Sequence, residues 1–367
     1  MKITALIPVY QKPKRVQSIV RTLLSDRHAE KEIVVVVDGE ATKEIKKALA
    51  PFGKRIKVRY NHERLGKSTA LNNVALEVSS DVLLFLDNDI VLPAGGTLLE
   101  ELSDIMCSQD IVELPKEAIT KSLISRMMGY EFLSIAMTEF VMAGLSGRSP
   151  SMNGAAFAVR TALFRKLRGF RQVFHEDMDF AARAFRDGAR FSYPPRLKVK
   201  NEVPDTIGDW LTQRKRWALN NILWLKENFF IVVLHMFKSP SFFLSAMLLF
   251  LPFIAYLVMF LTLKQLRITA ILPIIFMTVQ QYHVIAGLFL WLTHIDLIFV
   301  EGIIPTAGAI LFSGVLTGAF ARVLNFRFNP LEYLLFYFIY SPIWLIANAV
   351  MWIVVLLRID IKHDWKV

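Results

Sequence analysis

Residues 241–357 hold only seven charged side chains, whereas the whole chain of 367 residues has 43 Lys and Arg and 32 Asp and Glu. A stretch so poor in charge does not suit the surface of a water-soluble domain, and a helix needs about 20 apolar residues to cross a bilayer. We therefore predict a polar N-terminal domain followed by an all-α transmembrane domain of about four helices. The predicted spans are residues 241–263, 268–293, 297–321 and 331–357.

The segment between these two parts is apolar but short. Residues 229–234 are too few to span a bilayer, and Ser239-Pro240 predicts a break after them. We therefore divide the chain into a polar domain over 1–225, an interfacial segment over 226–240 and a membrane domain with a short tail over 241–367.

Polar side chains occur inside the predicted spans at Asp296, Glu301 and residues 280–283. Unpaired polar groups are costly in a bilayer and usually face a helix bundle or water. They are interpreted either as a polar path for an acceptor or as structural contacts between helices.

The net charge of +11 limits the classes of partner. A basic excess can favour anionic lipid headgroups, a nucleic acid or a ligand with phosphates. No nucleic-acid-binding motif accompanies the charge, so we predict a membrane partner and no nucleic acid. The single cysteine, Cys107, excludes an intrachain disulfide and a thiolate metal cage.

The N-terminal part alternates between two kinds of segment. Short apolar runs predict strands over residues 3–9, 32–37, 56–60 and 82–86, and helical composition lies between them over 15–25, 41–50 and 67–78. This alternation predicts an α/β domain with a mainly parallel, Rossmann-like sheet that has helices on both faces. Ligands bind at the carboxyl ends of such strands, so Asp38 and Asp87, each just after a strand, are expected at one edge.

A further amphipathic helix is predicted over residues 116–146. Its methionines and aromatic side chains are interpreted as core, with a membrane-contacting surface as the alternative.

Asp87-Asn88-Asp89 follows an apolar strand and carries two carboxylates two residues apart. Hard oxygen ligands of this kind suit Mg²⁺ or Mn²⁺, which leave coordination positions open for the phosphates of a ligand. The alternative is an ordinary turn, since Asp and Asn are common turn residues.

A second acidic cluster, residues 175–179, precedes a predicted helix. Capping explains one or two carboxylates at a helix N-terminus, because the helix dipole favours negative charge there. Three carboxylates in five residues, Glu176, Asp177 and Asp179, exceed that need, and a carboxylate of this cluster could act as the general base for an alcohol. His175 as a metal ligand is the alternative.

Two basic motifs complete the candidates. Gly66-Lys67 at a helix start can approach a phosphate, although Asn61 replaces the glycine that an ATPase P-loop requires. Residues 213–217, Gln-Arg-Lys-Arg-Trp, fit either a membrane-surface anchor or a diphosphate site in which an indole stacks on a sugar.

These motifs in this order resemble the family 2 inverting glycosyltransferases of GT-A fold, over roughly residues 1–225. The resemblance is to the membrane-embedded branch that includes cellulose, hyaluronan and chitin synthases and ceramide glucosyltransferase. It rests on the motifs above together with Ile7-Pro8-Val9-Tyr10 and Asn153-Gly154-Ala155.

For the donor, the resemblance implies that Asp38 contacts the nucleobase and that Lys67 lies near the nucleotide. Asp87 and Asp89 would serve nucleotide and metal, with Mg²⁺ or Mn²⁺ as the cofactor. It also implies a multi-pass protein of the cell membrane with a cytoplasmic catalytic domain.

For the transfer, the resemblance implies that Asp177 is the base and that Glu176 is its motif partner. Gln213, Arg216 and Trp217 match the family's QxxRW motif, which closes over the diphosphate and meets the acceptor sugar.

The function expected from this resemblance is metal-dependent transfer from a nucleoside diphosphate sugar, with a UDP-sugar favoured, to a hydroxyl or phosphate of a lipid or lipid-linked glycan acceptor. A processive synthase that extends and exports a polysaccharide is the alternative. Few spans with sparse polar residues favour the lipid-linked acceptor. A reading from another class is a non-catalytic nucleotide-sugar-binding subunit or transporter.

Overall fold

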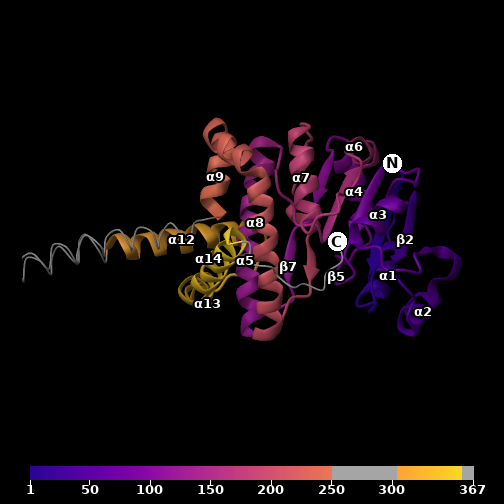
Figure 1. Ribbon diagram of the computed structural model, residues 1–367, viewed down its shortest axis with the longest axis horizontal. Helices are drawn as coiled ribbons and strands as arrows, with labels where there is room; N and C mark the ends of the chain where they lie inside the picture. Colours follow the sequence, from indigo (N-terminus) through magenta and orange to yellow (C-terminus); the bar gives the residue numbers. More distant parts are fainter. Residues whose placement is uncertain (250–303, 358–367) are drawn as a thin grey trace, which may run out of the picture.

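The computed structural model describes residues 1–249 and 304–357 (Figure 1). Its N-terminal part is an α/β domain with two sheets. The larger sheet has seven strands: β1 (Ile3–Val9), β2 (Lys31–Val37), β3 (Lys57–Tyr60), β4 (Val82–Leu86), β6 (Ile111–Glu113), β8 (Ala156–Arg160) and β9 (Phe191–Ser192). The smaller sheet has three: β5 (Ile90–Val91), β7 (Lys116–Ala118) and β10 (Val199–Asn201).

The strand order of the larger sheet is β3-β2-β1-β4-β8-β6-β9. Strands β3, β2, β1 and β4 run parallel, and β6 pairs parallel with β9. The prediction of a mainly parallel sheet is therefore confirmed. Strand β8 is the exception, because it runs antiparallel to both β4 and β6. The central strands are buried along almost their whole length, as expected for a sheet with both faces covered.

Helices cover both faces of this sheet (Figure 1). Alternate residues of β1 point to opposite faces, so Ile7 packs in one core cluster with Ile19 while Leu6 packs in the other with Leu71. The short helices of the domain are α1 (Val16–Leu24), α2 (Lys43–Leu49), η1 (Ala50–Arg55), α3 (Lys67–Ala75), α4 (Leu98–Met106), α6 (Thr161–Lys166), α7 (Glu176–Arg186) and η2 (Pro195–Leu197).

Helix α5 (Leu123–Ser146) replaces the predicted helix over 116–146. The prediction was wrong for residues 116–118, which pair with β10 as strand β7, and Ser122 caps the helix by accepting the N–H of Ser125 at 3.2 Å. The interpretation as core is confirmed for the buried side chains Met127, Met128, Phe132, Met137 and Met142.

Helix α8 (Ile207–Lys238) is continuous through residue 225. The predicted break is confirmed, because α8 ends before Ser239 and α9 (Pro240–Leu249) folds back from it (Figure 1). The predicted interfacial segment is thus the second half of a long helix. The other C-terminal elements are α12 (Ile304–Val323), α13 (Pro330–Leu335), the π-helical turn η4 (Phe336–Tyr340) and α14 (Ser341–Leu356).

Within the described residues, one helical stretch is long and apolar enough to cross a membrane, Pro330–Val354, with a mean hydropathy of 1.7. It coincides with the predicted span over 331–357. The other predicted spans are described only over 241–249 and 304–321, and the second overlaps the shorter apolar helix Ala307–Val323. The described part of the chain thus shows one candidate span where four were predicted.

The predicted span over 268–293 lies outside the described residues. So do the polar side chains at 280–283, Asp296 and Glu301.

Candidate active site

The shared edge of the sheet is formed as predicted. Strand β1 lies between β2 and β4, so the carboxyl ends that carry Asp38 and Asp87 meet at one side of the domain. Asp38 is buried, and it accepts the backbone N–H groups of Leu65 at 2.8 Å and Gly66 at 3.0 Å. Its carboxylate therefore anchors the loop that leads into helix α3.

Lys67 is the first residue of α3 and lies between acidic side chains. Gly66 before it has φ +92°, a conformation that glycine adopts without strain. The Lys67 ammonium is 2.8 Å from Asp87 Oδ1 and 3.6 Å from Glu176 Oε1. Burial opposes its charge, but the carboxylates of Asp87, Glu176 and Asp177 outweigh that effect and raise the pKa of Lys67 above its usual value. Lys67 is therefore a fixed cation of this site.

Glu176 and Asp177 occupy the first turn of α7. The two oxygens of Asp177 accept the N–H of Gly154 at 2.6 Å and the N–H of Met178 at 2.8 Å. A side chain at residue 154 would not fit, because a Cβ placed there would lie 2.5 Å from the Cβ of Asp177. The carboxylate is thus held from both sides by backbone groups.

One pocket joins these groups. Strand β4, helix α3, the start of α7 and the turn at residue 154 all contribute to its wall. It is lined by Pro8, Lys67, Leu71, Phe85, Leu86, Asp87, Gly154, Phe157, Phe170, Glu176 and Asp177.

Burial perturbs two carboxyl groups of the pocket. It raises the pKa of Glu176 to about 7, with Lys67 opposing and Asp177 and Asp87 adding to the rise. Burial also raises the pKa of Asp87, again against the charge of Lys67. Perturbed carboxyl groups that gather in a pocket are typical of active sites.

Replacing Glu176 with Gln should change the pH dependence of stability. Because the pKa of Glu176 is about 7 in the fold and 4.5 ordinarily, its ionisation lowers wild-type stability as the pH rises through that window. The variant lacks this loss, so its free energy of unfolding relative to wild type should increase between pH 4.5 and 7 by at most about 3 kcal/mol. Urea unfolding at several pH values measures it, with exposed Glu77→Gln as the control. If the difference in free energy of unfolding between Glu176→Gln and the wild type does not change with pH, the prediction is contradicted.

Asp89 lies beside the pocket and pairs with Lys14 at 3.0 Å. The loop before α1 covers the acidic triplet, since Arg15 donates its N–H to the carbonyl of Asn88 at 2.8 Å. In the described residues no three Asp, Glu, His or Cys side chains gather as a metal site. The two carboxylates are hard ligands that remain 30% and 25% exposed at Asp87 and Asp89, so they fit a divalent cation whose remaining ligands come from phosphates.

The motif over residues 213–217 is arranged differently from the expectation. Arg214, not Arg216, is buried, and it forms a close ion pair with Glu131 of α5. Arg216 is exposed. The ring of Trp217 stacks on Phe132, with centroids 6.5 Å apart, and lies 4.5 Å from the Arg214 guanidinium.

Gln213, Arg216 and Trp217 do not line the pocket. Helix α8 approaches the start of α7 about two turns later, where Trp224 donates its indole N–H to the carbonyl of Met178 at 3.1 Å. The structure thus brings Lys67, Asp87, Glu176 and Asp177 together in one pocket, with Asp38 holding the loop before Lys67 and Asp89 paired with Lys14. The 213–217 motif packs between α5 and the C-terminal helices.

His175 does not gather metal ligands in the described structure. It is buried, and its Nε2 atom lies 3.7 Å from Glu227 Oε2.

A buried polar cluster that was not predicted from the sequence lies behind Asp177 and consists of Glu113, Lys116 and Glu139. Its signal was present in the sequence, because Glu113 interrupts the apolar run Ile-Val-Glu-Leu at 111–114. A charged residue is rarely fully buried unless it is paired.

A solved structure has a similar fold. The structure of the mannosyltransferase PcManGT from Pyrobaculum calidifontis, in complex with GDP-Man and Mn²⁺, superposes with a TM-score of 0.54 at 17% identity, over 98% of this chain and 88% of that chain. This similarity shows a shared fold of the GT-A class. The fold prediction for the N-terminal domain is thereby confirmed.

Residues 83–300, more than half of the chain, match the family described as glycosyl transferase family group 2. The chain therefore belongs to this family of glycosyltransferases. This confirms the resemblance to family 2.

Two curated relatives carry the same name, poly-β-1,6-N-acetyl-D-glucosamine synthase. That of Staphylococcus aureus is 25% identical over 240 residues, which cover 62% of this chain and 56% of the relative. That of Staphylococcus epidermidis is 26% identical over 230 residues, which cover 59% and 53%. The chain thus spans about half the length of these relatives.

Proposed function

We propose that this glycosyltransferase moves a sugar from a nucleoside diphosphate sugar, with UDP-sugars as the favoured donors, to a membrane-associated lipid or lipid-linked acceptor. One observation carries the proposal. Asp177, Lys67 and Asp87 come from distant parts of the chain and line a single pocket at the carboxyl edge of the sheet, where α/β domains bind nucleotides.

In this proposal, Asp177 is the general base. Its carboxylate takes the proton of the acceptor hydroxyl while the acceptor oxygen bonds to the anomeric carbon and the bond from that carbon to the diphosphate breaks. A carboxylate in reach of the nucleophile accelerates such a step by about 10²–10⁴-fold. The two N–H groups that hold Asp177 keep it in place for this transfer.

Lys67 supports departure of the leaving group. Negative charge accumulates on the diphosphate as the sugar leaves, and one preorganised donor of this kind contributes about 3–4 kcal/mol. Asp87 and Asp89 would hold Mg²⁺ or Mn²⁺, which would supply further positive charge beside the diphosphate. Arg216 and Gln213 remain candidates for diphosphate contacts and Trp217 for the acceptor sugar.

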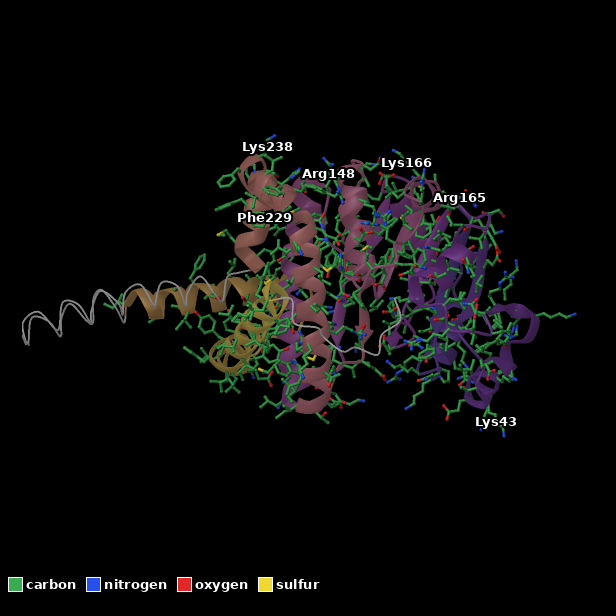
Figure 2. The ribbon with its side chains drawn as sticks, in the orientation of Figure 1. Lys43, Arg148, Arg165, Lys166, Phe229 and Lys238 are labelled. Atoms are coloured by element: carbon green, nitrogen blue, oxygen red, sulfur yellow. The ribbon has the colours of Figure 1, made fainter. Side chains whose placement is uncertain are left out.

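The membrane is the proposed location of the acceptor. Phe230, Leu234 and Phe237 lie along one face of α8 at 86%, 46% and 88% exposure, and Figure 2 shows Phe229 and Lys238 on the same helix. This exposed apolar face is typical of a helix that lies in the membrane interface. Together with the apolar stretch Pro330–Val354, it supports a protein that associates with a membrane. The proposal places the catalytic domain on the cytoplasmic side of the cell membrane.

A processive synthase is the second candidate function. It is favoured by the names of the curated relatives, which are polysaccharide synthases.

Product length separates the two candidates. Purified full-length protein is incubated with radiolabelled nucleotide sugars and membrane lipid extracts, each with Mn²⁺ or a chelator. A lipid product that gains one sugar supports the first function, a ladder of long glycans supports the second, and no transfer from any donor sugar contradicts both.

Replacing Asp89 with Ala should abolish metal-dependent transfer. We expect at least a hundredfold lower activity at saturating donor and weaker binding of Mn²⁺ by titration calorimetry, because half of the proposed ligand set is lost. Asp81→Ala, at the opposite exposed end of β4, is the control. Activity that persists in chelator in the wild type would exclude the metal.

A further inference from the structure

The loop over residues 149–154 holds the proposed base. It connects α5 to β8, and at its end Gly154 donates its N–H to Asp177 Oδ2 at 2.6 Å. Three buried charged side chains from other elements fix this loop: Glu113 at the end of β6, Lys116 at the start of β7 and Glu139 in α5.

Glu139 holds the start of the loop. Its Oε2 accepts the hydroxyl of Ser149 at 2.7 Å, and its Oε1 accepts the hydroxyl of Ser151 at 2.9 Å. Only 4% of Glu139 is exposed. Both oxygens of a buried carboxyl group are thus used to fix the loop.

Glu113 and Lys116 hold the end of the loop. Asn153 donates its N–H to Glu113 Oε1 at 3.1 Å, and the Lys116 ammonium donates to the carbonyl of Asn153 at 2.9 Å. That carbonyl and the N–H of Gly154 belong to the same peptide group. Because a peptide group is planar, Lys116 fixes the direction in which the Gly154 N–H points toward Asp177.

The same peptide group transmits the electrostatic effect of the Lys116 ammonium to Asp177. A hydrogen bond to the carbonyl oxygen polarises the amide and strengthens the bond that its N–H donates. Burial lowers the pKa of Lys116 to about 8, while the charges of Glu113, Asp177 and Asp87 oppose this. Burial also raises the pKa of Glu113 and brings that of Glu139 to about 7.

Buried ionisable groups cost stability unless their interactions compensate, so their gathering behind one loop calls for a role. We propose that Lys116, supported by Glu113 and Glu139, is a positioning residue for the base: through the 153–154 peptide it orients the carboxylate of Asp177 toward the acceptor. This inference rests on the proposed role of Asp177 and extends it to side chains outside the pocket.

The primary test is Lys116→Met in the full-length protein. We expect kcat to fall about 10–100-fold, because a base misplaced by about 1 Å costs up to 10² in rate, while the KM for the nucleotide sugar stays within twofold. Lys116→Arg, which keeps the charge and the donors, should recover most of kcat. Lys200→Met, exposed on the neighbouring strand β10, should have no effect.

The pH profile adds a readout that simple destabilisation does not change. Asp177 is faced by Lys67 of α3, Glu176 of its own helix, Glu113 of β6 and Lys116 of β7. Removing the positive charge of Lys116 disfavours the ionised carboxylate, so the acid limb of kcat should move to higher pH in Lys116→Met and not in Lys116→Arg.

The double variant Ser149→Ala, Ser151→Ala tests the same loop without a change of charge. The double variant should lower kcat, keep the KM for the nucleotide sugar and leave the acid limb of the kcat profile at the wild-type pH. If Lys116→Met does not fold, the double variant alone tests the positioning role. The positioning role is overturned if Lys116→Met has the kcat and the pH profile of the wild type. It is also overturned if the double variant has the kcat of the wild type. Full activity of Asp177→Asn would instead overturn the proposed function itself.

Discussion

Replacing Asp177 with Asn should lower kcat about 10²–10⁴-fold with little change in the KM for the nucleotide sugar. Asparagine keeps the size of the side chain and can still accept one backbone N–H, but it cannot take a proton from the acceptor. Transfer from radiolabelled donor to acceptor, measured under single-turnover conditions, reports the chemical step directly. The expected loss therefore isolates the base from the binding of donor.

Asp187→Asn is the matched control, because Asp187 lies just beyond the other end of α7, where it pairs with Lys166 at 2.8 Å. It should have wild-type kcat. Asp177→Asn that transfers sugar at the wild-type rate would show that another group takes the proton, with Glu176 the nearest candidate in the pocket.

Replacing Gly154 with Ala should also cause a large loss of activity, about 10²-fold in kcat. The new methyl group would lie 2.5 Å from Asp177 Cβ and 2.6 Å from Asp177 Oδ2, so the carboxylate must move. A displacement of about 1 Å in a catalytic group costs up to 10² in rate. Steady-state kinetics of the purified variant measure this effect.

Gly144→Ala in α5 is the control, because a Cβ there meets no atom within 4 Å. Its unfolding temperature should equal or exceed that of the wild type, since alanine favours a helix more than glycine does. If Gly154→Ala kept the wild-type kcat, a shifted Asp177 carboxylate would still support transfer. That result would contradict the proposal that transfer depends on the exact position of Asp177.

Local sequence patterns were sufficient for much of the fold. The predicted strands over 3–9 and 82–86 have the observed bounds, because short, largely apolar runs of this length are buried from both faces. The positions of Asp38 and Asp87 followed from the apolar runs over 32–37 and 82–86, since parallel strands end at one edge.

Elsewhere, contacts between distant segments made predictions from local sequence patterns wrong. Residues 116–118 were predicted to begin a helix, yet they form β7 because Val199–Asn201 pairs with them. Likewise, Arg214 and Arg216 are equally basic in the sequence, but only Arg214 meets Glu131 and the aromatic rings of Trp217 and Trp344.

The sequence by itself determined the family, the α/β sheet and the residue types of the active site, because strand ends and apolar runs are local properties of the chain. Only the tertiary structure decided that Lys67 lies between Asp87 and Glu176 and that Gly154 touches Asp177. These contacts join residues 20 to 109 positions apart, and no local pattern encodes which of the possible partners will meet.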